Sequence, residues 1–474
     1  MISIFDVRSG VTFMYFFRWP TARTTGFSIL VAATLLAAGI ASAQEEQLEY
    51  NFLGAGARAN GMGDAFVAVA DDATAIFWNP AGLYLLDQPE TSFGFQFVSE
   101  TVEQTRQRRA LLLTSNDRGG TVGLNFASFV FPKRFGQKKF VFAFAIQKAF
   151  DFTGEFLEVE ARAPLLLDQE SSSGGPFGYS GGVAFSPFQG LMLGLSASIY
   201  RGSADIEESQ ITTVGELLVS VSDTVSIPVN GTSLGIGALY DFQPRGGPPL
   251  RLGFKFAPNF SFSGKIDTDL TFQVADSQGI VNSESLQADF DYVLDFPLDL
   301  GFGAAWNPRR DVLVAADFEH RRLRNAALSV IGAPDVDLDE DGNLVIQRGD
   351  RTNALSDSGA DLNQWRVGVE WSWVNALTVI PIRFGAKNLP QRSADEQRFI
   401  DAETGETTTS FGDQVVGTAL TGGLGFVTDS FVFDFSVEYG RWSQEIVLFD
   451  SEGSHFQESK TRRLALKTSV VIYF

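Results

Sequence analysis

Segments of about ten residues in which large apolar side chains occupy every second position recur from residue 90 onward. Residues 93–97 read FGFQF, residues 140–147 read FVFAFAIQ and residues 431–439 read FVFDFSVEY. A period of two places alternate side chains on opposite faces of a β-strand. Each such strand therefore has one strongly apolar face and one small or charged face, which predicts an all-β protein.

The apolar face is too aromatic, in too many strands, for a surface in contact with water. A soluble sandwich would bury this face between two sheets. A transmembrane barrel would turn it toward lipid and leave the small and polar face inside. By parity, the lumen-facing charges would include the following residues: Asp317, Glu319, Arg366, Glu370, Asp434, Glu438, Arg463 and Lys467. We expect them to pair across the lumen or to contact whatever fills it.

Connection lengths favour the membrane barrel. Short turns alternate with longer polar connections, near 102–119, 153–176, 204–231, 263–290, 325–362, 389–414 and 443–459. Outer-membrane barrels alternate short periplasmic turns with long outer loops in this way. We expect about 14 antiparallel strands, near 91–101, 120–131, 139–151, 178–187, 191–202, 232–242, 250–262, 291–306, 311–323, 364–372, 377–388, 415–427, 431–442 and 460–473. Twelve or sixteen strands stay open, because 263–290 has the weakest pattern.

The N-terminal segment has the features of an export signal. Residues 26–41 form an apolar run after Arg18 and Arg23, and Ala41-Ser42-Ala43 is a small-residue cleavage site. We expect residues 1–43 to be a signal peptide cleaved after Ala43. The alternative is a membrane anchor, but the run is shorter than the roughly 20 residues that a spanning helix needs.

Residues 44–89, between this signal and the first strand, lack the alternation. They contain GAGARANGMGDAFVAVADDATAIFWNPAGL at 54–83. A barrel of 14 strands is wider than the eight-stranded kind that side chains can fill. We therefore expect residues 44–89 to plug the lumen and residues 90–474 to form the barrel. Whether this plug moves to open a passage, or only seals and braces the barrel, is left open by the sequence.

The stretch from residue 54 to residue 83 closely resembles the N-terminal hatch motif of the FadL/TodX-like outer-membrane transporters, and more closely that of their PorV/PorQ relatives. The resemblance rests on the following hatch-motif residues: Gly61, Gly63, Asp71, Asp72, Asn79, Pro80 and Gly82. It implies a 14-stranded outer-membrane barrel with an N-terminal hatch in its lumen. The strand pattern and a terminal Phe474, which looks like the signal read by the outer-membrane assembly machinery, extend the resemblance over the mature chain.

Elementary chemistry of the motif agrees with a compact plug. Asp71 or Asp72 can cap a short helix over 73–77 by accepting from its free N–H groups. Pro80 ends that helix and holds Asn79 in an extended conformation. Gly61 and Gly63 permit backbone that a Cβ would obstruct.

Composition removes several classes of function. The formal charge of −21 excludes a nucleic-acid partner, which needs a basic surface. The absence of Cys fits an exported protein without disulfides. The two His residues, His320 and His455, lie in no recognisable nucleophile motif, so we expect no enzyme and no cofactor.

One loop carries a candidate metal site. Residues 337–342 read DLDEDG, which matches the first half of a calcium loop, with the candidate ligands Asp337, Asp339 and Asp341. The twelfth position holds Arg348 instead of the usual Glu. A structural calcium in an outer loop and a merely solvated acidic loop are the two alternatives.

Two functions follow from the resemblance. In the first, the chain passes hydrophobic small molecules, such as long-chain fatty acids or hydrocarbons, across the bacterial outer membrane, with Phe66, Ile76 and Phe77 of the hatch lining the route. In the second, it is a PorV-like outer-membrane component of protein secretion and surface attachment that binds cargo proteins. Besides a small molecule or a secreted protein, the expected partners are outer-membrane lipid and the assembly machinery, which would act through Phe474.

Overall fold

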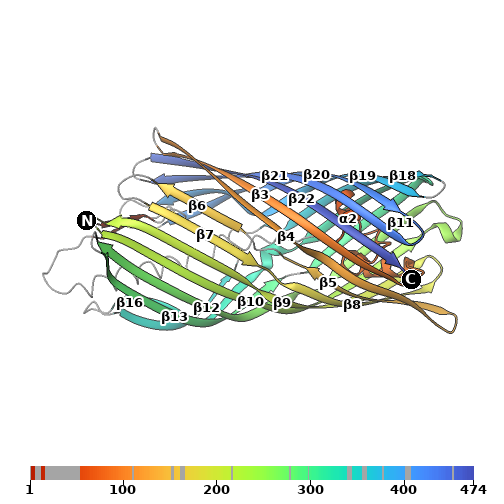
Figure 1. Cartoon of the computed structure of the whole chain (residues 1–474), viewed down its shortest axis with the longest axis horizontal. Coiled ribbons are helices and arrows are strands. Elements are labelled where there is room, and N and C mark those ends of the chain that lie inside the picture. Colours follow the sequence, from red (N-terminus) through yellow and green to blue (C-terminus); the bar gives the residue numbers. More distant parts are fainter. Residues whose placement is uncertain are drawn as a thin grey trace.

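The computed structural model describes residues 2–5, 12–15, 54–108, 111–150, 154–160, 166–214, 217–276, 279–296, 298–338, 344–354, 360–375, 378–400, 407–450 and 453–474. The strands form an elongated closed barrel, and the C terminus lies at one end of it (Figure 1). A separate hairpin of β1 (Ile2–Phe5) and β2 (Thr12–Tyr15) falls within the expected signal peptide, whose cleavage site lies outside the described residues.

Fourteen described strands close into one antiparallel ring, as expected from the sequence. In ring order they are β3 (Glu90–Arg108), β4 (Leu111–Phe135), β5 (Lys138–Lys148), β8 (Phe177–Phe188), β9 (Leu191–Val214), β10 (Leu217–Asp241), β11 (Leu250–Ala257), β14 (Asp299–Arg309), β15 (Val312–Arg321), β18 (Leu362–Val374), β19 (Val379–Ile400), β20 (Thr407–Val427), β21 (Phe431–Asp450) and β22 (Gly453–Tyr473), which pairs with β3.

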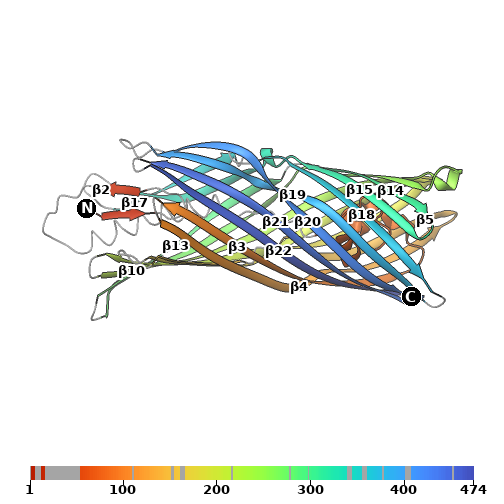
Figure 2. The same ribbon diagram turned by 90° about the horizontal axis from the view of Figure 1, so that it is seen from above.

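Three further hairpins extend the wall at the end away from the C terminus (Figures 1 and 2). They are β6 (Gly154–Glu160) with β7 (Leu166–Gly174), β12 (Phe260–Asp276) with β13 (Gly279–Phe296), and β16 (Ala327–Leu338) with β17 (Leu344–Ala354). Much of what the sequence predicts as long polar connections is strand: 263–290 belongs to β12 and β13, and 204–231 belongs to β9 and β10. A two-residue period runs through parts of these segments, but its apolar residues, such as Val219, Ile266 and Phe272, are the buried ones and the alternate polar residues are more exposed.

Two expected strands are interrupted. Residues 250–262 divide into β11 and β12, and residues 291–306 divide into β13 and β14. Pro258 lies in the first interruption, where it offers no N–H to a ladder hydrogen bond. The two halves of each expected strand have different pairing partners: β11 pairs with β14, whereas β12 pairs with β13. Two short 3₁₀ helices, η2 (Gln243–Arg245) and η3 (Leu323–Asn325), connect strands.

The outward face of the ring is apolar and exposed. On β3, Phe93 and Phe95 have exposed fractions of 44% and 54%, whereas Gln96, which follows Phe95, faces inward and is 3% exposed. The same alternation on β21 exposes Phe433 and buries Asp434. The inside is thus polar and the outside aromatic, the reverse of a soluble barrel.

The lumen is filled near the end that carries the C terminus by residues 54–89, the described part of the hatch (Figure 1). It contains α2 (Ala57–Gly61), α3 (Ala75–Trp78) and the 3₁₀ helix η1 (Pro80–Leu85). Its apolar side chains, including Met62, Phe66 and Leu83, form one buried cluster with inward residues of the wall. None of the helices in the described part of the chain is both long and apolar enough to cross a membrane.

Candidate functional site

The motif residues fold the hatch locally. Asn79 is extended, with φ −162° and ψ 102°, and it ends α3 before Pro80 starts η1. Its side-chain oxygen accepts from Ala81 N at 3.2 Å, and its amide donates to Val67 O at 2.8 Å. Asp72 lies further from α3 than expected: its carboxylate accepts from Thr74 N at 2.9 Å, and Thr74 is the residue that precedes the helix.

The glycines of the motif allow close approach between the hatch and the wall. Gly63 has φ +65°, and a Cβ there would lie 2.8 Å from Ala386 N of β19. A Cβ on Gly61 would lie 3.2 Å from the Cα of Gly423 on β20. A Cβ on Gly82 would overlap the carbonyl of Ala70 within the hatch. Gly63 and Gly82 thus leave no room for a larger residue, whereas at Gly61 the neighbouring strand would have to shift by a small distance.

The wall contributes glycines of its own at the height of the hatch. A Cβ on any of them would meet hatch backbone or a hatch side chain. They come from seven of the eight consecutive ring strands from β8 to β19, all but β15: Gly182, Gly194, Gly237, Gly253, Gly303, Gly368 and Gly385. The hatch therefore contacts the backbone of the barrel directly over about half of its circumference.

Ion pairs also join the hatch to the wall. The Arg58 guanidinium donates to both carboxylate oxygens of Glu370, at 3.0 and 3.3 Å, and also binds Asp71. Glu370 in turn accepts from Arg383 at 2.7 Å, and Arg383 donates to Asp434 at 2.6 Å. This chain of charges runs from α2 across β18 and β19 to β21.

A second network joins the hatch to β19, β21 and β22. Asp64 forms an ion pair with Lys387, which also donates to Glu438 at 2.8 Å. Glu438 accepts from Asn60 at 2.6 Å and from Arg463 at 2.9 Å. Burial raises the pKa of Asp64, but the nearby ammonium groups, with that of Lys387 foremost, outweigh it and hold this pKa below its usual value.

All eight lumen charges expected from parity thus lie inside the barrel, and each contacts a partner. Asp317 accepts from Val67 N of the hatch at 2.7 Å, and Lys467 donates to Gly54 O at 2.6 Å. Glu319 accepts from Arg366 at 2.6 Å within the wall. The sequence indicated these residues. Arg383 and Lys387 were not among them, although both lie in the expected strand 377–388 and share one face with Gly385.

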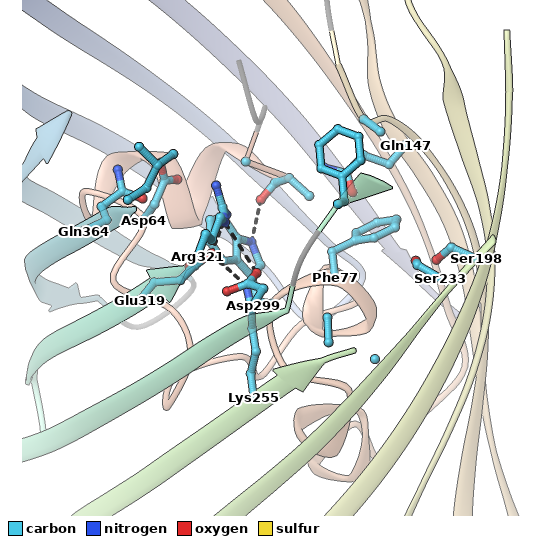
Figure 3. A pocket seen from close by; sticks show the side chains of 18 of the residues that line it. Asp64, Phe77, Gln147, Ser198, Ser233, Lys255, Asp299, Glu319, Arg321 and Gln364 are labelled. Carbon is cyan, nitrogen blue, oxygen red and sulfur yellow. Dashed lines mark hydrogen bonds and ion pairs between the residues drawn. The ribbon is translucent and has the colours of Figure 1, made fainter. Parts of the chain in front are cut away.

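A cavity of about 270 Å³ lies between the hatch and the outer half of the barrel. We call it the outer cavity. Ile76 and Phe77 of the hatch line it, as expected, whereas Phe66 does not. Phe66 is fully buried inside the hatch, with its ring 6.2 Å from that of Trp78. Figure 3 shows Phe77 directed into the cavity, toward Ser198 and Ser233 of the wall.

The outer cavity has an apolar side and a charged side. Aromatic rings on the apolar side pack against one another, with 5.9 Å between the rings of Phe150 and Phe296 and 5.0 Å between those of Phe260 and Phe296. On the charged side, Lys255 lies 3.2 Å from both Asp299 and Glu319 (Figure 3). Such a site suits a molecule with an apolar body and a polar end.

The candidate calcium ligands receive no further support. Asp339 and Asp341 lie outside the described residues, and Asp337 belongs to β16 with a side chain that is likewise not described. Within the described ranges, no group of three or more His, Cys, Asp or Glu side chains could hold a metal ion. His320 contacts the side chain of Asn363 at 2.8 Å.

Neither a family model nor a curated protein matches the chain. Several solved structures match the chain. The toluene transporter TodX of Pseudomonas putida has a TM-score of 0.54 and 12% identity over 90% of this chain and 99% of that one. A TodX monoaromatic hydrocarbon channel variant has a TM-score of 0.57 and 14% identity over 90% and 100%. A FadL homologue of Pseudomonas aeruginosa has a TM-score of 0.55 and 11% identity over 89% and 99%.

These likenesses cover nearly the whole of each protein, and they support the FadL/TodX-like fold that the hatch motif implies. The structures reported are transport channels rather than enzymes. The closer resemblance to PorV/PorQ stays a prediction.

Proposed function

We propose that the chain is an outer-membrane barrel that passes a hydrophobic small molecule, such as a long-chain fatty acid or a hydrocarbon, from the cell surface toward the periplasm. The outer cavity carries this proposal, because it combines aromatic rings with a charged side directly above a plugged lumen. The exposed aromatic face of the ring supports a lipid environment. The likeness to a toluene transporter and to a FadL homologue agrees with this role.

In this proposal, residues 1–43 are removed on export, residues 44–89 form the hatch and residues 90–474 form the barrel. The aromatic belt contacts outer-membrane lipid, and Phe474, which is 71% exposed, is presented to the assembly machinery. N-terminal sequencing of the protein purified from outer membranes is expected to begin at Gln44. An N terminus that precedes the apolar run would contradict the cleavage.

The secretion function would need a surface for cargo proteins, and no feature of the described residues favours one. It remains the alternative that the motif alone suggests. The channels that the barrel is similar to agree with the passage of small molecules instead.

Uptake of radiolabelled oleic acid or toluene by a Gram-negative host without a carrier of its own tests the proposal. Wild-type protein is expected to raise uptake above that of cells without it. Ser198→Trp, which fills the outer cavity, is expected to abolish the increase. Ala197→Trp, one residue away on the exposed outer face, is its matched control and should retain uptake. Equal uptake with and without the wild-type protein would overturn the proposal.

A further inference from the structure

Two arginines lie directly opposite each other on the outer surface of the barrel. Arg441 of β21 and Arg462 of β22 are cross-strand partners in the antiparallel register, and both side chains are exposed. Figure 2 shows these two strands side by side along the wall. We propose that this arginine pair binds a phosphate group of a phosphorylated glycolipid in the outer leaflet of the outer membrane. The inference concerns the lipid around the barrel and does not depend on the passage of a ligand through it.

The alternation along β21 and β22 places the arginine pair on the lipid-facing side. Trp442, the next residue of β21, is 8% exposed and faces inward. The outward pair next to the arginines, Tyr439 with Leu464, is apolar and exposed. On β21 an unbroken row of exposed apolar residues leads up to Arg441, namely Phe431, Phe433, Phe435, Val437 and Tyr439. The arginines therefore lie where this apolar row ends.

The height of the pair agrees with the outer boundary of the membrane. Arg441 lies ten residues from Phe431, with which β21 begins at the end of the short turns, and Arg462 lies ten residues from Ile472, the partner of Phe431. Ten residues of antiparallel strand extend roughly 34 Å. A strand tilt of about 40° reduces this to roughly 26 Å along the membrane normal, and the apolar band of an outer-membrane barrel is about 25 Å tall. The pair thus lies at the level of the lipid phosphates.

The charge of the pair is only partly balanced by the protein. Like charges directly opposite each other on one face of a sheet destabilise it. Glu103 of β3 lies 3.5 Å from Arg462, and Glu458 is engaged by Lys460 at 2.8 Å. Within the described part of the chain, no carboxylate forms an ion pair with Arg441. A phosphate between the two guanidinium groups would accept hydrogen bonds from both and compensate their charge.

The surface around the pair fits a lipid better than it fits a protein segment. A glycolipid has acyl chains below its phosphate, and the residues below the arginines are the exposed apolar side chains of Val437, Tyr439 and Leu464. A phosphate monoester carries up to two negative charges, which matches two guanidinium groups. Both halves of such a molecule would therefore contact a complementary part of the wall.

Titration of the full-length protein in micelles with bisphosphorylated lipid A tests the proposal, with native mass spectrometry as the measure of the bound fraction. Arg441→Gln removes half of the pair and is expected to lower this fraction about fivefold. Arg201→Gln is the matched control. Arg201 is exposed on β9, ten residues from Leu191, but it lies opposite Phe177 and Asn230 instead of a second arginine. This variant should change the bound fraction less than about twofold.

Two results of this titration would overturn the inference. Equal losses in Arg441→Gln and Arg201→Gln would mean that any cation at the membrane boundary attracts the lipid. No loss in Arg441→Gln would place the glycolipid elsewhere on the barrel. The heat-resistant gel mobility of the folded barrel is checked for each variant.

A comparison of lipids on wild-type protein covers the case in which a variant does not fold. Lipid A with two phosphates is expected to give a bound fraction about fivefold higher than the same glycolipid without phosphates. Phosphatidylglycerol, whose phosphodiester carries one charge, is expected to bind less than lipid A as well. Equal binding of the phosphate-free glycolipid would show that acyl chains alone hold it. Equal binding of phosphatidylglycerol would mean that the pair takes any anionic phospholipid, and either result contradicts a site for the outer-leaflet glycolipid.

Discussion

Arg58 of the hatch and Glu370 of the wall, 312 positions apart in the sequence, form a two-point ion pair with N–O distances of 3.0 and 3.3 Å. Both side chains are largely buried, with exposed fractions of 19% and 12%. A buried pair that loses one partner leaves an uncompensated charge behind. This contact is therefore a sensitive measure of how firmly the hatch is held.

Replacement of Arg58 is expected to loosen the hatch. Arg58→Gln should lower the free energy of unfolding by about 3 kcal/mol, because Glu370 and Asp71 lose a buried cation. Guanidinium unfolding in micelles measures the stability, and conductance across a planar bilayer reports leakage past the hatch. Arg309→Gln, which removes an exposed ion pair with Asp311, is the control and should change stability by less than about 0.5 kcal/mol. Equal stability of Arg58→Gln and wild type would show that the pair does not hold the hatch.

The wall glycines make a second prediction. A Cβ on Gly385 would overlap the backbone of Gly63 in the hatch. Gly385→Ala is therefore expected to displace the hatch while the strands still pair, which raises bilayer conductance. Gly123→Ala on β4 is the matched control, because a Cβ there would have no neighbour within 4 Å. If the conductance of Gly385→Ala is as low as that of Gly123→Ala, the added Cβ does not open a leak past the hatch and the prediction is wrong.

The strands of the ring could be predicted from the sequence wherever one face contacts lipid and the other faces the lumen, because apolar and polar residues then alternate. On β21, Phe433 and Phe435 are exposed while Asp434 and Glu438 are buried, as the alternation indicates. The prediction failed in the outer half, where the alternation is the reverse of that in the aromatic strands. On β10 and β12, Val219, Ile266 and Phe272 are buried while the polar residues that alternate with them are more exposed, so these segments lack an aromatic outward face and were taken for polar connections.

The candidate site was accessible from sequence only in part. The hatch motif and the lumen charges could be identified, and Ile76 and Phe77 do line the outer cavity. The wall glycines could not be identified from the sequence, because the atom that a side chain would meet at each of them belongs to a hatch residue far away in the chain. A Cβ on Gly368, for example, would meet Met62 O. Phe66 was placed in the cavity by proximity alone, whereas its ring packs inside the hatch against Trp78.

Asp72 makes the stability of the hatch dependent on pH. Burial raises the pKa of its carboxyl above the usual 3.8, against the opposing effects of Arg58 and of the hydrogen bonds from Thr74. A carboxyl whose pKa is higher in the folded state favours folding fully below about pH 4, and this contribution is lost as the pH rises through the folded-state pKa. Asp72→Asn keeps an acceptor for Thr74 and does not titrate.

Wild type should therefore be less stable than Asp72→Asn at neutral pH, and the difference should shrink toward zero as the pH falls to about 4. Chemical unfolding at a series of pH values measures it. A wild type that is more stable than Asp72→Asn at neutral pH, and that loses this advantage on acidification, would mean that Arg58 stabilises Asp72 as a carboxylate instead.

The shape of the outer cavity predicts that Phe77 contributes to ligand binding. Phe77 is half-buried and presents its ring to the cavity, so a bound apolar chain would cover it (Figure 3). Truncation to alanine removes apolar contact worth about 1 kcal/mol, which corresponds to about fivefold weaker binding. Phe77→Ala should thus raise the Kd for oleic acid about fivefold in titrations of the micelle-embedded protein. Phe95→Ala, a 54% exposed aromatic on the outward face, should leave the Kd unchanged. A similar loss in both variants would indicate an effect of detergent packing, and no loss in either would place the ligand elsewhere in the barrel.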